Sequence, residues 1–188
     1  MFRPRVFSPV ASYCETAMFT PDPLRDPGPL IRRVYAYVAY RIGEGPDAED
    51  VTSEVFERAL RYRKSYDRAR GQPIGWLIGI ARRCIDDAVQ ARAAGTDELP
   101  EVTAPGDLEA DAVERLTVAA AVAGLDERER DLIALRYGAD LTARQIAELL
   151  GMRPNAVEVA LHRALARLRI ALERDVGAPA TEFRSVRI

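Results

Sequence analysis

The spacing of the apolar residues constrains the fold of this chain more than any other feature. In two blocks, residues 30–94 and 108–176, apolar side chains recur every three or four positions, which is the period of one face of an α-helix. No segment stands out with the alternating apolar and polar residues of a strand. We therefore expect an all-α protein with two small helical domains, one for each block.

The segment between the two blocks has a different composition. Residues 95–107 contain two prolines, four carboxylates and no basic residue, which predicts a flexible acidic linker. The wider segment 95–118 has seven acidic residues and one basic residue, a net charge of −6, although the whole chain carries only −2. Residues 1–29, with six prolines, and residues 177–188, without a pattern, are expected to be a flexible N-terminal segment and a flexible tail.

Three helices are expected in the first block. The first buries a stripe formed by Leu30, Ile31, Val34, Tyr35, Val38, Ala39 and Ile42. Asp47 is expected to cap the second helix, whose main apolar stripe runs to Tyr62. A second stripe of Phe56 and Leu60 indicates that this helix packs on two sides, with either another helix of the domain or a partner as its second neighbour.

The third helix follows a loop, residues 66–75, that contains two glycines and a proline. Trp76 stands at the start of this helix and is expected to anchor the core, with stacking on a nucleic-acid base as the alternative. Cys84 lies on the apolar stripe and is expected to be a small core residue. Cys14 is the only other cysteine, and the spacing of the two fits neither a disulfide framework nor a zinc site.

The second block predicts four helices. Their expected ranges are 108–123, 126–137, 142–150 and 154–174. Two of them begin with a capping pattern: Asp126 precedes Glu129 by three residues, and Thr142 precedes Gln145 by three residues. This block is therefore expected to form a four-helix domain.

The segment TARQIAELLGMRPNAVEVALHRA is typical of a helix-turn-helix. Ala147 is small enough for two helices to cross closely, Gly151 can adopt the positive φ of a tight turn, and Val157 can hold the second helix in place. The helix from Pro154 would then face outwards, as a recognition helix in a major groove does. A purely structural helical hairpin is the alternative.

Polar side chains of this motif are the candidates for DNA contact. They are Arg144, Arg153, Asn155, Glu158, His162 and Arg163. Arginine can bind phosphates or guanine edges, and asparagine can read adenine. Asn155 and Glu158 can alternatively form a capping box at the start of the helix.

The composition argues against an enzyme. His162 is the only histidine, and the sequence has no glycine-rich phosphate loop, metal-spaced cluster or pair of nucleophile and base. We expect no cofactor and no metal. No apolar run reaches the length of a membrane span, and the N-terminus has no apolar core of signal-peptide length. With only two cysteines, these features favour the cytoplasm.

Two long motifs occur in a characteristic order. The first is DAEDVTSEVFERALRYRKSYDRARGQPIGWLIGIARRCIDDAV, and the second is LDERERDLIALRYGADLTARQIAELLGMRPNAVEVALHRALARLR. Together they resemble the two conserved domains of bacterial RNA polymerase sigma factors of the extracytoplasmic-function (ECF) subfamily. The resemblance covers roughly residues 30–174.

The resemblance implies a promoter-specificity subunit of RNA polymerase that is monomeric when free. Residues 30–94 would be a region 2-like domain that binds the clamp helices of the core enzyme and recognises and melts the −10 element. Residues 108–176 would be a region 4-like domain that binds the −35 element and meets the flap tip. An anti-sigma protein is a further candidate partner on the same grounds.

The same resemblance implies two sets of site residues in the front domain. Those expected to face core polymerase lie on the second helix: Glu49, Asp50, Ser53, Glu54 and Glu57. Those expected at the −10 element lie in the loop and the third helix: Tyr66, Asp67, Arg68, Arg70, Gln72 and Arg83. For each carboxylate on the second helix, a solvated helix face is the alternative.

Three positions depart from the family pattern. Arg83 stands where many members have asparagine, Gln90 where many have arginine, and Glu158 near a position that usually carries a lysine or arginine. A carboxylate near phosphates weakens binding unless it accepts from cytosine or caps a helix. The rival function is a stand-alone helix-turn-helix transcriptional regulator, which would have no need of the first motif.

Overall fold

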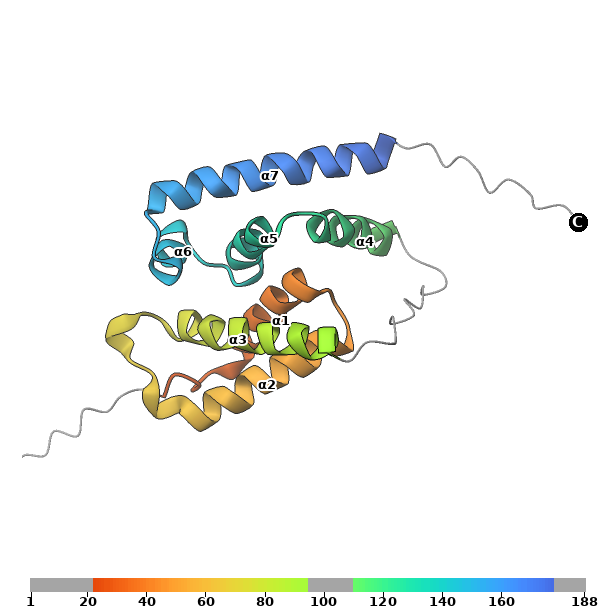
Figure 1. Cartoon of the computed structure of the whole chain (residues 1–188). Helices are drawn as coiled ribbons and strands as arrows, with labels where there is room; N and C mark the ends of the chain where they lie inside the picture. Colours follow the sequence, from red (N-terminus) through yellow and green to blue (C-terminus); the bar gives the residue numbers. More distant parts are fainter. Residues whose placement is uncertain (1–21, 95–109, 178–188) are drawn as a thin grey trace, which may run out of the picture.

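The computed structural model describes residues 22–94 and 110–177, and these form seven α-helices and no strand. The front group holds three helices, α1 (Pro27–Ile42), α2 (Pro46–Tyr62) and α3 (Pro73–Ala94). The rear group holds four helices, α4 (Ala110–Ala123), α5 (Glu127–Ile133), α6 (Ala143–Leu150) and α7 (Pro154–Gly177). Figure 1 shows the two groups packed one above the other. The predicted all-α class with a three-helix and a four-helix group is confirmed.

Three helix starts in the front group differ from the prediction. Helix α3 begins at Pro73, inside the predicted loop 66–75. Helix α1 begins at Pro27 rather than Leu30, because proline is tolerated in the first turn, where its missing N–H would have no partner in any case. The expected cap Asp47 is wrong: α2 begins at Pro46 after Gly45, which has a φ of 118°. Asp47 lies inside the first turn and pairs with Arg92 of α3.

Local signals set the ends of the rear helices as predicted. The Asp126 side chain accepts a hydrogen bond from the Glu129 N–H at 2.8 Å. Thr142 and Gln145 form the complete capping box at the start of α6. Gly151 ends α6 in the left-handed region with a φ of 65°, which costs glycine little.

Helix α1 is buried on two sides. It packs against α2 and α3 within the front group, and against α4, α5 and the π-helical turn Ala134–Gly138 of the rear group. One hydrophobic cluster therefore extends through both groups and joins Val34 and Val38 to Leu135. The predicted single stripe missed Tyr37, which is fully buried on the side facing the rear group.

The backbones of the two groups approach each other closely at Gly138. A Cβ added there would lie 2.8 Å from both the Cα and the N of Tyr37. Real Cβ atoms do not approach backbone so closely, so any side chain at this position would push α1 away from the turn. Gly138 thus permits the two groups to contact each other through their backbones.

Helix α2 departs from its predicted pattern at its C-terminal end. Phe56 packs against the core, as expected for the second apolar stripe. Tyr62, which was placed on the main stripe, is 54% exposed, and Leu60 is 58% exposed. The helix continues there into a short 3-10 turn, Arg63–Ser65, beyond the helices that could cover these side chains.

The predicted flexible segments lie mostly outside the described residues. These are residues 1–21, the linker 95–107 and the tail from residue 178. Cys14 falls among them, so only Cys84 can be placed. Cys84 is buried, and its burial raises the pKa of the thiol, which agrees with the predicted core role.

Candidate nucleic-acid interface

The helix-turn-helix is built by α6, α7 and the turn between them. Ala147 and Val157 are buried where the two helices meet, while Gly151 in the turn is exposed. The Met152 N–H donates to the Ala147 carbonyl at 2.9 Å, which holds the turn against α6. The three predicted positions thus have the burial that the motif requires.

Helix α7 presents its first turns to solvent. Arg153, Asn155, Glu158, His162 and Arg163 are all exposed, as predicted for a recognition helix. The side chains of Arg153 and Arg163 form no hydrogen bond or ion pair with any residue in the described part of the chain, so their guanidinium groups are free to bind an anion.

The alternative capping box at Asn155 and Glu158 is wrong. Helix α7 begins at Pro154, so Asn155 is its second residue and cannot be the N-cap. Arg153 takes that place, since its carbonyl accepts from the N–H groups of Ala156 and Val157 at 2.9 and 3.1 Å. Asn155 and Glu158 therefore remain predicted DNA contacts.

Arg144 lies on α6 and differs from the other predicted contacts. Its Nε is 3.2 Å from the Glu148 carboxylate, one helical turn along, and both side chains are largely exposed. Because exposed pairs of this kind contribute little free energy, Arg144 can exchange Glu148 for a phosphate at small cost. Its DNA contact stays a prediction.

The loop between α2 and α3 is compact rather than irregular. The Tyr66 hydroxyl donates to the Gly71 carbonyl at 2.9 Å and closes the loop. Asp67 accepts from the Ala69 N–H at 2.9 Å at the start of a second 3-10 turn, Arg68–Arg70. Trp76 packs against the core, as expected, and also against the Tyr66 ring, with centroids 5.6 Å apart.

Exposed basic side chains surround this loop. Of the predicted −10 residues, Asp67, Arg68, Arg70, Gln72 and Arg83 are exposed and Tyr66 is half-buried. The structure brings a further exposed set next to them from the end of α2: Arg61, Tyr62, Arg63 and Lys64. Basic residues interleaved with an aromatic residue are typical of single-strand binding surfaces, and the RYRK run could have revealed this set in the sequence.

The outer face of α2 carries the predicted polymerase contacts. Glu49, Asp50, Ser53 and Glu57 are exposed. Helix α2 itself lies on the side of the front group away from the rear group in Figure 1. Glu54 is engaged instead, since its carboxylate lies 2.5 Å from Arg58 Nε. The exposed Leu60 adjoins the same face.

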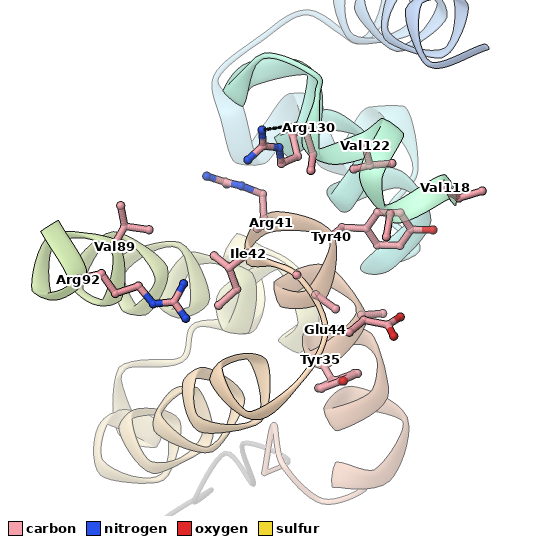
Figure 2. Close-up of a pocket in the computed structure, with 15 residues that line it drawn as sticks. Tyr35, Tyr40, Arg41, Ile42, Glu44, Val89, Arg92, Val118, Val122 and Arg130 are labelled. Carbon is pink, nitrogen blue, oxygen red and sulfur yellow. Dashed lines mark hydrogen bonds between the residues drawn. The ribbon is translucent and has the colours of Figure 1, made fainter. Parts of the chain in front are cut away.

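A cavity of about 940 Å³ opens between the ends of α1 and α3 and one side of α4 (Figure 2). Its apolar wall includes Tyr40, Val89 and Val118. The charged residues among its described lining are Arg41, Glu44, Arg92 and Arg130. The cavity thus combines an apolar surface with a net positive lining, which suits an amphipathic acidic segment.

Comparison with known proteins identifies both halves. The family model for Sigma-70 region 2 matches residues 29–94, and that for Sigma-70 region 4 matches residues 115–168. The ECF RNA polymerase sigma factor SigL of Mycobacterium tuberculosis is 31% identical over 147 residues, which cover 74% of this chain and 82% of the relative. The chain belongs to the ECF subfamily of RNA polymerase sigma factors. The predicted family and the predicted function as a sigma subunit of RNA polymerase are confirmed.

Further comparisons agree with this assignment. The ECF RNA polymerase sigma factor SigK of Mycobacterium ulcerans is 29% identical to this ECF sigma factor over 150 residues, which cover 75% of the chain and 80% of the relative. The fold is shared with the sigma factor RpoE solved in complex with the anti-sigma factor NepR from Bartonella quintana, at a TM-score of 0.63 and 17% identity over 78% of this chain and 93% of that one. The match over residues 29–94 counts against a stand-alone helix-turn-helix regulator.

The described residues of this sigma factor hold neither a membrane-spanning helix nor a cluster of metal ligands. None of the described helices is both long and apolar enough to cross a lipid bilayer. No group of three or more histidine, cysteine, aspartate and glutamate residues there is arranged to hold a metal ion.

Proposed function

We propose that this sigma factor contacts promoter DNA through two separate surfaces, one in each helical group. A region 2-like domain, residues 30–94, binds core polymerase and the −10 element, and a region 4-like domain, residues 108–176, binds the −35 element. The observation that carries this proposal is the exposed pair Arg153 and Arg163, whose side chains bind none of the described residues, at the start of a helix held outward by the α6–α7 turn.

At the −35 element, the first turns of α7 enter the major groove. Arg153 and Arg163 bind phosphates, and Asn155 and His162 lie where base edges would be. Glu158, also exposed, accepts from the exocyclic amine of cytosine, the base edge that a carboxylate recognises.

At the −10 element, the exposed loop holds the opened strand. Taking a base out of the duplex costs a few kcal/mol, and stacking a base on an aromatic side chain returns about 1–3 kcal/mol. The exposed Tyr62 and the half-buried Tyr66 offer such rings, and the surrounding arginines neutralise the strand's phosphates. Trp76 supports Tyr66 from beneath by ring contact.

The outer face of α2 docks on the clamp helices of core polymerase. Its exposed carboxylates match a basic surface, and Leu60 supplies an apolar contact that becomes buried in the complex. Polymerase performs the chemistry, and the sigma factor itself catalyses no reaction. It acts in the cytoplasm, where polymerase and DNA are, and is monomeric until it binds them.

The cavity in Figure 2 is the candidate site for an anti-sigma protein. A helix with one apolar face and acidic flanks would fill it and pair with Arg130, whose guanidinium otherwise donates to backbone carbonyls. Such a partner would contact both helical groups at once, because α1 and α3 form one wall of the cavity and α4 the other.

Run-off transcription tests the function. The purified chain is added to core polymerase and candidate promoter templates. Discrete transcripts are expected only when the chain and core polymerase are both present. The double variant Arg153→Ala, Arg163→Ala is expected to lose transcription from templates that depend on the −35 element. Arg169→Ala, an exposed arginine of the same helix paired with Glu173, is the matched control and keeps it. A chain that never associates with core polymerase would overturn the proposal.

A further inference from the structure

A buried polar network joins the two helical groups. Asp131 of α5 is 8% exposed in its side chain, and its carboxylate accepts from the Tyr37 hydroxyl at 2.8 Å. The same carboxylate is 2.6 Å from Arg41 and 3.2 Å from Arg82. All three partners belong to the front group, so Asp131 is a rear-group carboxylate whose hydrogen bonds and ion pairs all cross the interface.

The network is costly to bury and therefore specific. A buried carboxylate needs its charge balanced and its lone pairs filled, and Asp131 meets both needs only when α1 and α3 are in place. Tyr37 is buried with it, and this burial together with the Asp131 charge raises the pKa of the phenol above its ordinary value. The phenol thus stays a hydrogen-bond donor to Asp131.

A second set of contacts holds the π-helical turn against α1. The Arg33 guanidinium donates from Nε to the Ala139 carbonyl at 2.8 Å and from Nη2 to the Asp140 carbonyl at 2.9 Å. These carbonyls end the turn, so a front-group side chain completes a rear-group helix terminus. Gly138 lies in the same turn, with no room for a Cβ against Tyr37.

This packing places the two proposed DNA-binding surfaces next to each other. Gln72 of the −10 loop and Gln145 of α6 are 3.4 Å apart, within hydrogen-bond distance. A promoter separates its −10 and −35 elements by roughly 25 base pairs, which at about 3.4 Å each is about 85 Å. A folded body of about 140 residues is only about 40 Å across. One straight promoter cannot reach both surfaces in this arrangement.

We propose that the contact of Asp131 with Tyr37, Arg41 and Arg82, together with the close approach at Gly138, is an intramolecular latch that holds the free sigma factor in a closed, promoter-incompetent state. The latch rests on the proposed function, since its consequence follows from where the two promoter elements bind. The outer face of α2 and the first turns of α7 are exposed in the closed state, so each can engage its target before the groups separate.

The latch lowers the apparent affinity for a complete promoter. If only a fraction of molecules is open, the apparent dissociation constant rises by the inverse of that fraction. Any variant that opens the latch should therefore reach half-maximal transcription at a lower protein concentration than the parent. Binding to a short duplex with the −35 element alone should be unchanged, because the first turns of α7 are exposed in both states.

Fluorescence energy transfer within the full chain tests the latch without DNA. Dyes are attached to Ala91→Cys in α3 and Ala166→Cys in α7, both exposed positions, after Cys14→Ser and Cys84→Ala. The free parent protein is expected to give one high-transfer population. Adding core polymerase and promoter should convert it to low transfer.

Two variants with different chemistry should open the latch. Gly138→Ala adds a Cβ against the Tyr37 backbone, and Asp131→Asn removes the buried negative charge that faces Arg41 and Arg82. Each is expected to shift the closed-to-open ratio at least about tenfold toward open. The added Cβ forces the Tyr37 backbone away, and removing one partner of a buried ion pair is strongly unfavourable. The matched controls are Gly124→Ala, whose Cβ meets only its own helix at 3.5 Å, and Glu127→Gln, an exposed partner of the same Arg41.

The outcomes separate the latch from the proposed function. Circular dichroism first verifies that each variant keeps its helices. Unchanged energy transfer in both Gly138→Ala and Asp131→Asn overturns the latch. Lower transfer with no decrease in the sigma concentration for half-maximal run-off transcription overturns its inhibitory role. If no protein, the parent included, supports transcription, the proposed function fails, while the energy transfer still decides whether the latch exists.

Discussion

Removing one hydroxyl group from the interface gives a sharp test of its energetics. Tyr37→Phe keeps the buried ring and deletes the hydrogen bond of 2.8 Å to Asp131. A hydrogen bond to a charged group contributes about 1.5–3 kcal/mol. The lower end applies here, because Asp131 keeps its ion pairs with Arg41 and Arg82. For about 140 ordered residues, 1.5 kcal/mol corresponds to a melting temperature about 5 °C lower.

The pH dependence of the same variant follows from the raised pKa of Tyr37. In the unfolded chain the phenol ionises near its ordinary pKa of 10.0, whereas in the folded protein it stays protonated to higher pH. The stability from this group is therefore complete below pH 10 and is lost as pH rises above 10 toward the folded pKa. One such group adds a slope of up to about 1.4 kcal/mol per pH unit, and Tyr37→Phe should lack that part of the slope.

Urea unfolding followed by circular dichroism from pH 7 to pH 11 measures both effects. Tyr137→Phe is the matched control, since this tyrosine lies in the neighbouring π-helical turn and is 51% exposed. It is expected to leave the urea midpoint at pH 7 unchanged. Equal behaviour of the two variants would show that the Tyr37 hydroxyl contributes nothing at the interface, and the reasoning above would be refuted.

Three further predictions concern single side chains. Arg163→Ala should weaken binding to a −35 duplex whatever its sequence, and it should reduce the slope of log affinity against log salt concentration by about 1. Anisotropy titrations measure this slope, with Arg169→Ala as the control. An unchanged slope would remove Arg163 from the phosphate contacts. Gly151→Ala should destabilise the chain by about 1 kcal/mol in urea titrations, because its φ of 65° is unfavourable for alanine, whereas Gly124→Ala should not. Leu60→Ser should leave thermal stability intact and weaken capture by core polymerase, and equal capture would argue against a docking role for α2.

Much of the candidate DNA interface could be predicted because its signals are local. The Thr142 capping box, the Gly151 turn and the burial of Ala147 and Val157 depend on neighbours within about ten residues along the chain. The burial of Val157 fixes which side of α7 faces inward, and so predicts which positions from Arg153 to Arg163 are exposed. Where prediction failed locally, at Asp47 and at the Asn155 capping box, the helix began at a proline, one residue ahead of each expected cap.

The sequence by itself determined which segments are helices and where most of them end, because helical period, caps and glycine turns act over a few residues. Only the tertiary structure decided that Tyr37 is buried beside Asp131, 94 residues away, and that Gly138 rather than Gly124 receives the backbone of α1. The second buried side of α1 shows no separate apolar period in the sequence, because this side is shielded from water only when the rear group packs against it. The partners of a buried charge are therefore decided in space, by which helices meet.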